Sequence, residues 1–170
     1  MRTVILKCWF IGFLFIPLFL FSQRTDKYNS IYETYFKAEE LYSHLQYGAA
    51  KKEYRDFINS CNNPNDPLYQ KALYYEGVSA LELYNFDAIP LLMEYNRLYP
   101  ENIHRKMISF KIGRFFFHDQ SYDDAQLWFE KVTAADLDSS YREEYHFKMG
   151  YCALQNGIKE LAIKVFRENI

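Results

Sequence analysis

The chain has 170 residues, 49% of them hydrophobic and 25% charged, which fits one globular domain and excludes wholesale disorder. Asp and Glu outnumber Lys and Arg by 22 to 20. This acidic balance argues against nucleic acid as a ligand, since phosphate binding needs a basic surface. The aromatic share is high, at 19%. Tyrosine in particular suits half-buried helices, because its ring is apolar and its hydroxyl is polar.

Residues 1–22 have the layout of a secretory signal peptide. Arg2 and Lys7 provide a basic start, and the uncharged apolar run Cys8–Phe21 leads into polar sequence. A retained membrane anchor is the alternative, but this run has 14 residues, whereas a spanning helix needs about 20. A lipoprotein would carry its cysteine at the cleavage point, and Cys8 precedes the apolar run. We therefore expect an exported protein that is not a lipoprotein.

A short pattern recurs along the rest of the chain: an alanine is followed four residues later by a bulky side chain. The pairs are Ala50 and Tyr54, Ala88 and Leu92, Ala125 and Phe129, and Ala162 and Phe166. The alanines are 38, 37 and 37 residues apart. A fixed period of this size is typical of a repeat array. Apolar residues at helical spacing indicate that each unit consists of two helices.

Several residues predict where helices begin and end. Capping signals are expected at Ser30 with Glu33, Asp66 with Pro67, Ser121 with Asp124, and Ser140 with Glu143. Pro90 is expected in the first turn of its helix, where a missing N–H costs little, and Pro100 closes that helix. The third unit should contain helices within 104–120 and 121–136.

A small residue also stands mid-way along each first helix, in phase with the alanine of the second. These residues are Ala38, Gly77, Gly113 and Gly150. Together with Tyr47 and Tyr122 before second helices, this pattern resembles the tetratricopeptide repeat family over nearly all of residues 30–170. The resemblance implies an all-α, right-handed α-solenoid of about four helix-turn-helix units, in which the small residues let paired helices approach closely.

The predicted organisation follows the repeat period. It consists of a signal peptide at 1–22, a short leader at 23–29, and repeat-like units at 30–65, 66–102, 103–138 and 139–170. The fourth unit is incomplete because the chain stops at Ile170 without a polar capping helix. We therefore expect a fragment of a longer repeat protein. The alternative is that the edge around Leu161, Val165 and Phe166 binds something else.

The chain carries no sequence motif for catalysis. Glycine-rich phosphate loops, Cys-x-x-Cys, His-Glu-x-x-His and Gly-x-Ser-x-Gly are all absent. The histidines are scattered over different units: His44, His104, His118 and His146. Cys61 and Cys152 belong to units one and four, too far apart for a disulfide if neighbouring helices lie about 8–10 Å apart. We expect no catalytic residue, cofactor or metal, and hence no enzyme.

The resemblance implies that the first helices line an inner groove that binds a partner. Its positions in this chain are Tyr35, Glu39, Tyr42, Tyr74, Val78, Leu81, Phe110, Arg114, Phe117, His118, Phe147, Tyr151 and Leu154. This set predicts a continuous aromatic strip with one cation, suited to an extended or hydrophobic peptide. A variant of the family clamps a terminal carboxylate with Lys and Asn, which these positions lack.

The sequence thus predicts a non-enzymatic interaction scaffold that binds a protein or peptide. It resembles the N-terminal part of exported tetratricopeptide proteins of Gram-negative bacteria, which implies a periplasmic or outer-membrane-associated location. Membrane contact is expected only through the signal peptide during export. The alternative function is an assembly element of an envelope complex that acts by self-association or through its open end.

Overall fold

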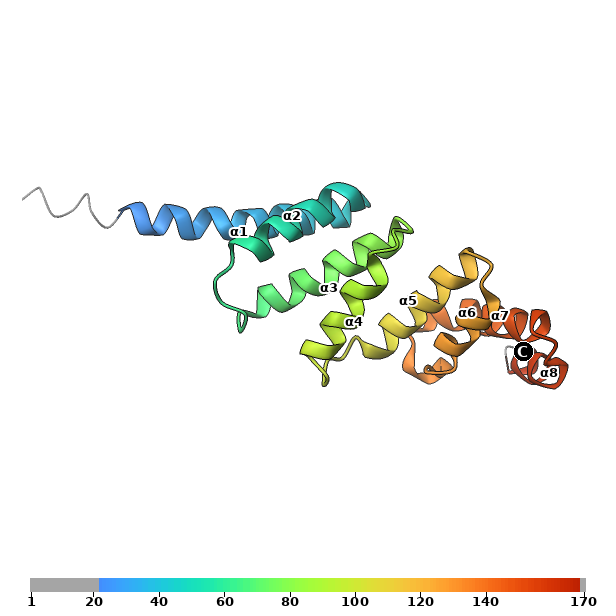
Figure 1. The fold of residues 1–170 in the computed structure, drawn as a ribbon. Coiled ribbons are helices and arrows are strands. Elements are labelled where there is room, and N and C mark those ends of the chain that lie inside the picture. Colours follow the sequence, from blue (N-terminus) through green and yellow to red (C-terminus); the bar gives the residue numbers. More distant parts are fainter. Residues whose placement is uncertain (1–21, 169–170) are drawn as a thin grey trace, which may run out of the picture.

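A computed structural model describes residues 22–168, so the signal peptide prediction lies outside the described residues except at Ser22 (Figure 1). In this range the chain forms eight α-helices and one short 3-10 helix, with no strand, which confirms the all-α prediction. The helices are α1 Ser22–Ser43, α2 Tyr47–Ser60, α3 Pro67–Glu82, α4 Ala88–Leu98, α5 Arg105–His118, α6 Tyr122–Phe129, η2 Ala134–Asp136, α7 Ser139–Gln155 and α8 Lys159–Arg167.

The helices form an elongated row in chain order, with α1 and α2 at one end and α7 and α8 at the other (Figure 1). Each α-helix packs against the next one along the chain. The odd-numbered helices also touch one another in sequence, α1 with α3, α3 with α5 and α5 with α7. The odd-numbered helices therefore share one side of the row.

The hydrophobic core is divided along the row into three clusters, and each of the first two takes side chains from the following helix pair. The cluster of α1 and α2 includes Ala72 from α3. The cluster of α3 and α4 includes Ile108, Ile112 and Phe115 from α5. Helices α5 to α8 build the third cluster together. A helix pair thus completes its core only by packing on its neighbour, as in repeat arrays.

The same turn ends α1, α3, α5 and α7. The second residue after each helix end has a left-handed backbone, at Leu45 (φ 60°), Tyr84 (52°), Gln120 (60°) and Gly157 (78°). The N–H of this residue donates to the carbonyl three residues back, and the next N–H donates to the carbonyl five residues before it. This is the Schellman arrangement, which satisfies carbonyls left free at a helix end. Only Gly157 has no Cβ to strain in this conformation.

Helix α4 begins later after its turn than α2, α6 and α8 do. Those three helices start two residues after the left-handed residue, but α4 starts at Ala88, four residues after Tyr84. A tight turn fills the gap, with the Ala88 N–H donating to the Asn85 carbonyl over 3.1 Å. Pro90 explains the delay, because without an N–H it must lie within the first turn of a helix. The prediction for Pro90 is confirmed.

Three glycines lie where the second helix of a pair approaches the first. A Cβ added at Gly77 would lie 2.7 Å from Leu92, one at Gly113 2.6 Å from Phe129, and one at Gly150 2.6 Å from Phe166. The neighbours are the bulky residues that follow the periodic alanines by four positions. The prediction that these glycines permit close helix approach is therefore confirmed.

The predicted helix starts are correct in part. Asp66 caps α3, its carboxylate accepting from the Leu68 N–H over 2.8 Å. Ser121 is the N-cap of α6, but its side chain makes no capping bond, so the capping box is wrong. Ser30 does not begin a helix, because α1 already starts at Ser22 and includes the leader. Helix α7 starts one residue before Ser140, again without a side-chain cap.

Helix α6 ends at Phe129, although the sequence predicted a helix up to Asp136. Thr133 and Asp136 form a capping box that starts a separate 3-10 turn, in which Asp136 Oδ2 accepts from the Thr133 N–H (2.8 Å) and hydroxyl (2.9 Å). The β-branched Val132 and Thr133 favour such a break over helix continuation. The second helix of the third unit is therefore much shorter than predicted.

Side chains from neighbouring helices satisfy the carbonyls freed at this break. Lys106 Nζ of α5 donates to the Lys131 carbonyl over 2.8 Å. The buried Tyr145 hydroxyl of α7 donates to the Val132 carbonyl, also over 2.8 Å. Tertiary contacts with α5 and α7 therefore stabilise the short form of α6.

The glycine contacts generate a first prediction. Gly113→Ala should lower the free energy of unfolding by about 1–3 kcal/mol, because Phe129 is fully buried and cannot move aside. Gly150→Ala should lower the free energy of unfolding much less, because the neighbouring Phe166 side chain is 37% exposed and can turn outward. Urea unfolding followed by circular dichroism measures both. Equal losses in the two variants would contradict the proposed packing.

The turns generate a second prediction. Gln120→Gly should raise the free energy of unfolding by about 0.5–1 kcal/mol, because it removes the strained Cβ from a left-handed backbone position. Gly157→Ala should lower it by about 1 kcal/mol for the converse reason. Thermal unfolding of the two variants measures these shifts, and shifts of the same sign would be inconsistent with a shared turn.

Candidate interaction surfaces

Five of the thirteen predicted groove residues are buried, and they correct the predicted continuous strip. They are Tyr35, Tyr74, Val78, Leu81 and Phe110. The cause is contact with the second helix of the same pair as well as with the following helix pair. Phe110, for example, packs against Phe129 and Tyr141, with ring centroids 6.0 and 5.5 Å away. These five residues belong to the core.

The other eight predicted positions are half-buried or exposed. They are Glu39, Tyr42, Arg114, Phe117, His118, Phe147, Tyr151 and Leu154. Six of them belong to α5 and α7. The candidate surface, called the inner surface below, is therefore concentrated on the C-terminal half of the row.

Four aromatic rings meet on the inner surface and form what we call the ring cluster: Phe117, Tyr122, Phe147 and Tyr151. The Tyr151 centroid lies 5.6 Å from Phe117, 5.4 Å from Tyr122 and 6.1 Å from Phe147. Lys148 Nζ lies 4.6 Å from the Phe117 centroid, in cation–π range. Phe147 is 53% exposed, so the cluster presents an apolar ring to solvent. Tyr122, at the start of α6, was not among the predicted groove residues.

Beside the ring cluster, ion pairs join α3, α5 and α7 into a ladder. Lys111 Nζ lies 2.7 Å from Glu82, Arg114 Nε lies 2.8 Å from Glu144, and Lys148 Nζ lies 3.2 Å from Glu144. The sequence prediction counted one cation, whereas the structure gathers three cations and two carboxylates. Each cation is already paired with a carboxylate, and Glu144 is shared by two of them, so the ladder mainly orients helices. Only the i,i+4 spacing of Glu144 and Lys148 was visible in the sequence.

Tyr42 links the N-terminal helices to this surface. Its ring centroid lies 5.4 Å from Tyr47 and 5.0 Å from Tyr75. Burial raises the pKa of Tyr42, and the Glu82 carboxylate raises it further, with smaller contributions from tyrosines that include Tyr141 of α7. The Tyr42 hydroxyl therefore stays neutral and can donate a hydrogen bond at any physiological pH.

One buried ion pair connects α2 to α3. Glu76 is almost fully buried, and its carboxylate accepts from Arg55 Nε. Burial raises the pKa of Glu76 above its ordinary value, and the opposing effect of Arg55 is smaller because that side chain is half-exposed. This ion pair therefore connects the first helix pair to the second, although burying the Glu76 carboxylate costs electrostatic free energy.

The histidines and cysteines lie in separate surroundings. His104 stacks on Tyr74 at 4.0 Å between centroids, and burial lowers the pKa of His104. His118 stacks on Tyr84 at 3.7 Å. Cys152 is a free thiol in the third core cluster, where burial raises its pKa to about 12 and keeps it unreactive. Cys61 is also free.

Within residues 22–168, no group of three His, Cys, Asp or Glu side chains is arranged to hold a metal ion. Over the same part of the chain, no helix has both the length and the apolar character that crossing a bilayer requires. No model of a known protein family, no curated protein and no solved structure matches the chain. The functional argument therefore depends on the residues themselves.

Glu76 generates a third prediction. A carboxyl group with a raised folded-state pKa stabilises the fold most below its unfolded value near 4.5, and this contribution falls as pH rises through the folded-state pKa. Glu76→Gln cannot titrate. Its free energy of unfolding, relative to wild type, should therefore increase from about pH 4 to about pH 7. Urea unfolding across this range measures the trend.

Glu94→Gln is the matched control, because hydrogen bonds from Arg97 lower the pKa of Glu94 on the surface. Its stabilising contribution is present above the unfolded pKa and is lost as pH falls. The relative stability of this variant should therefore change slightly in the opposite direction. A flat or falling curve for Glu76→Gln would refute the assignment of a raised pKa.

Proposed function

We propose that the chain is a non-enzymatic interaction scaffold that binds a protein segment on its inner surface. In this proposal the helix pairs form a right-handed solenoid of about four tetratricopeptide-like units. The recurring Schellman turn and the three glycine contacts support the repeat assignment, because each occurs at the same place in successive helix pairs. The proposed boundaries between units are those that the sequence predicts, with α1 extending back over the leader at 23–29.

The exposed part of the ring cluster is the observation that carries the proposal. Phe147 is 53% exposed, and Leu154 is 48% exposed at the i+7 position of the same helix. Tyr151 lies between them on that face of α7. Adjacent exposed apolar side chains are unfavourable in water and mark interaction sites in many proteins.

The partner expected here is a protein segment that inserts an apolar side chain between Phe147 and Leu154. Half-buried tyrosines such as Tyr151 and Tyr122 can hydrogen-bond its backbone, since tyrosine combines an apolar ring with a polar hydroxyl. Every cation of the ion-pair ladder already has a carboxylate partner, so the ladder offers no free cation to hold a charged terminus. This chemistry favours a hydrophobic segment, as the sequence suggested, over nucleic acid.

The proposal places the protein in the bacterial envelope. The support is the basic and then apolar sequence of residues 1–22, which is typical of a signal peptide. Periplasmic location or association with the outer membrane follows from the resemblance to exported tetratricopeptide proteins.

Self-association is a second candidate function, and helix α8 favours it. Ile158, Ile163 and Phe166 lie at or on this helix with 41%, 52% and 37% of their surface exposed. Two copies could cover these side chains against each other. Light scattering distinguishes the candidates: a mass that rises with concentration, and falls in Ile163→Ser, supports assembly through α8.

A fourth prediction tests the inner surface. The double variant Phe147→Ser/Leu154→Ser should lose at least about tenfold in partner capture from an envelope extract, because it removes the exposed apolar contacts. Phe36→Ser on α1 is the control, since Phe36 is similarly exposed but lies far along the row (Figure 1). Quantitative mass spectrometry of the captured proteins measures the loss, and thermal unfolding verifies the fold. Undiminished capture by the double variant would exclude the inner surface.

A further inference from the structure

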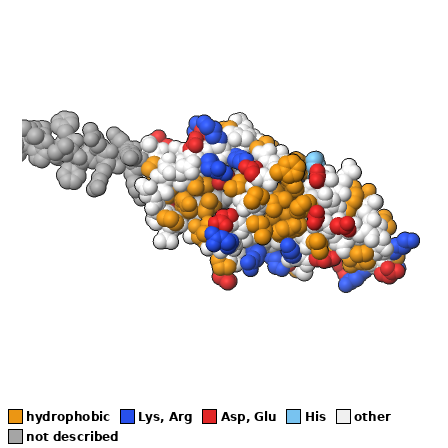
Figure 2. Space-filling model, viewed as in Figure 1, with side chains coloured by type: hydrophobic (Ala, Val, Ile, Leu, Met, Phe, Trp, Pro, Cys, Tyr) orange, Lys and Arg blue, Asp and Glu red, His pale blue; other side chains and the backbone are white. Residues whose placement is uncertain are grey.

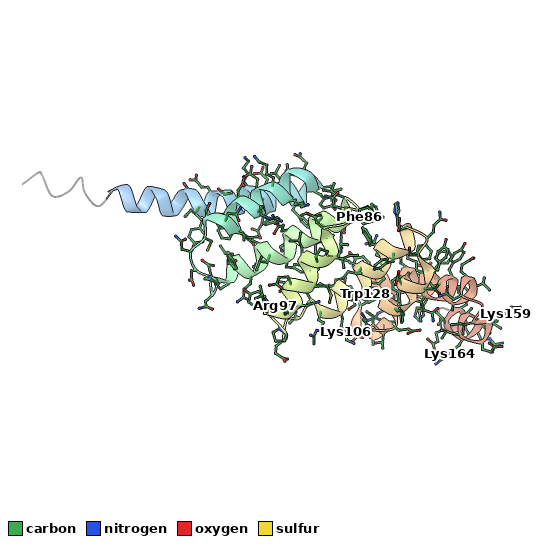
Figure 3. All side chains as sticks on the ribbon, viewed as in Figure 1. Phe86, Arg97, Lys106, Trp128, Lys159 and Lys164 are labelled. Carbon is green, nitrogen blue, oxygen red and sulfur yellow. The ribbon has the colours of Figure 1, made fainter. Side chains whose placement is uncertain are left out.

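A hydrophobic patch lies on the outer face of the row, formed by α4 and α6. Figure 2 shows hydrophobic side chains gathered at the centre of this view, and Figure 3 places Phe86 and Trp128 there. We call Phe86, Ile89, Met93 and Trp128 the outer patch. None of these residues belongs to the inner surface, so the patch is independent of the proposed function.

The irregular start of α4 exposes one end of the outer patch. Because Pro90 delays the helix, Phe86 lies in the turn before α4 instead of within it, and the ring is 80% exposed. The Phe86 ring packs edge-on against Phe115, at 6.0 Å between centroids. Ile89 and Met93 continue the patch at i,i+4 spacing on the same face of α4.

The early end of α6 opens a pocket of about 260 Å³ at the other end of the outer patch. Its lining combines Met93 and Trp128 with three basic side chains and two neutral polar ones: Arg105, Lys106, Lys131, Asn96 and Ser109. Figure 3 labels Lys106 close to Trp128. The pocket thus joins an apolar surface to a basic edge.

The basic edge is unusual because the chain as a whole has more acidic than basic residues. No carboxylate lines the pocket. Lys131 Nζ lies 3.3 Å from the Trp128 ring centroid. Lys106 Nζ is held by the Lys131 carbonyl and lies 3.6 Å from Asp136. Arg105 forms no ion pair with any side chain in residues 30–168.

We propose that the outer patch binds an acidic amphipathic segment of a partner protein. An apolar side chain of the segment enters the pocket between Met93 and Trp128, and a neighbouring carboxylate pairs with Arg105. Charge complementarity selects this occupant. Three cations and no carboxylate line the pocket, and Arg105 has no ion-pair partner within residues 30–168. Phe86 extends the apolar contact along the same segment.

The test uses the full chain and a fluorescein-labelled eight-residue peptide in which Phe and Leu are flanked by glutamates. Anisotropy should show saturable binding, weakened at least tenfold when glutamine replaces the glutamates, and weakened as NaCl rises from about 50 to about 500 mM. Binding should also change the tryptophan fluorescence. Since the chain has two tryptophans, loss of the change in Trp128→Phe assigns it to the outer patch.

Two surface variants localise the binding. Arg105→Glu and Met93→Ser should each weaken the glutamate peptide at least tenfold, because one removes the charge partner and the other the apolar wall. Lys164→Glu on α8 and Phe36→Ser on α1 are the matched controls and should leave it unchanged. These four side chains are exposed, so the fold is expected to survive in all of them.

Several outcomes would overturn the proposal. Absence of binding by wild type, equal affinity for the glutamine peptide, or full affinity in Arg105→Glu each excludes an acidic segment on the outer patch. Loss of binding only in Phe147→Ser/Leu154→Ser would show that the peptide binds the inner surface instead. A dimer that Met93→Ser dissolves would identify a second copy of the chain as the occupant. The inner-surface test measures capture of partners from an extract and not binding of this peptide, so the two proposals can fail independently.

Discussion

The structure depends on the packing of each helix pair against the following pair. Ala72 completes the core of α1 and α2, and Ile108, Ile112 and Phe115 complete that of α3 and α4. Because a pair of short helices buries too little apolar surface to fold alone, each pair stabilises its predecessor. The helix pairs therefore form an elongated row (Figure 1).

Close approach within each pair places tight demands on a few residues. A glycine stands opposite a bulky side chain in three pairs, and the first pair has the buried Ala38 at the matching position. The Schellman turns then set the direction in which the second helix returns. In three of these turns the left-handed residue is not glycine, so its Cβ is strained. Favourable helix packing therefore outweighs the backbone preference of these residues.

The candidate interaction surfaces arise where the regular pattern breaks or where it cannot cover side chains. On the inner side, α5 and α7 leave Phe147 and Leu154 uncovered beside the ion-pair ladder. On the outer side, Pro90 delays α4 and the Thr133 capping box shortens α6. The two breaks lie at opposite ends of one apolar patch, and the end at α6 has a basic edge. Two faces of one scaffold could therefore serve two partners of different chemistry.

The sequence by itself determined the all-α architecture, the period of the helix pairs, and local features that follow from covalent chemistry. The Asp66 cap, the position of Pro90 and the close approach at Gly113 were all predictable, because each depends on neighbours at known helical spacing. The resemblance to a repeat family and the signal peptide remain predictions. The tertiary structure alone decided which predicted groove residues stay accessible. Tyr74 and Phe110 are buried because residues from other helix pairs cover them, and the end of α6 depends on Lys106 and Tyr145 reaching its free carbonyls. Burial and helix termination of this kind depend on side chains distant in the sequence, so no local pattern encodes them.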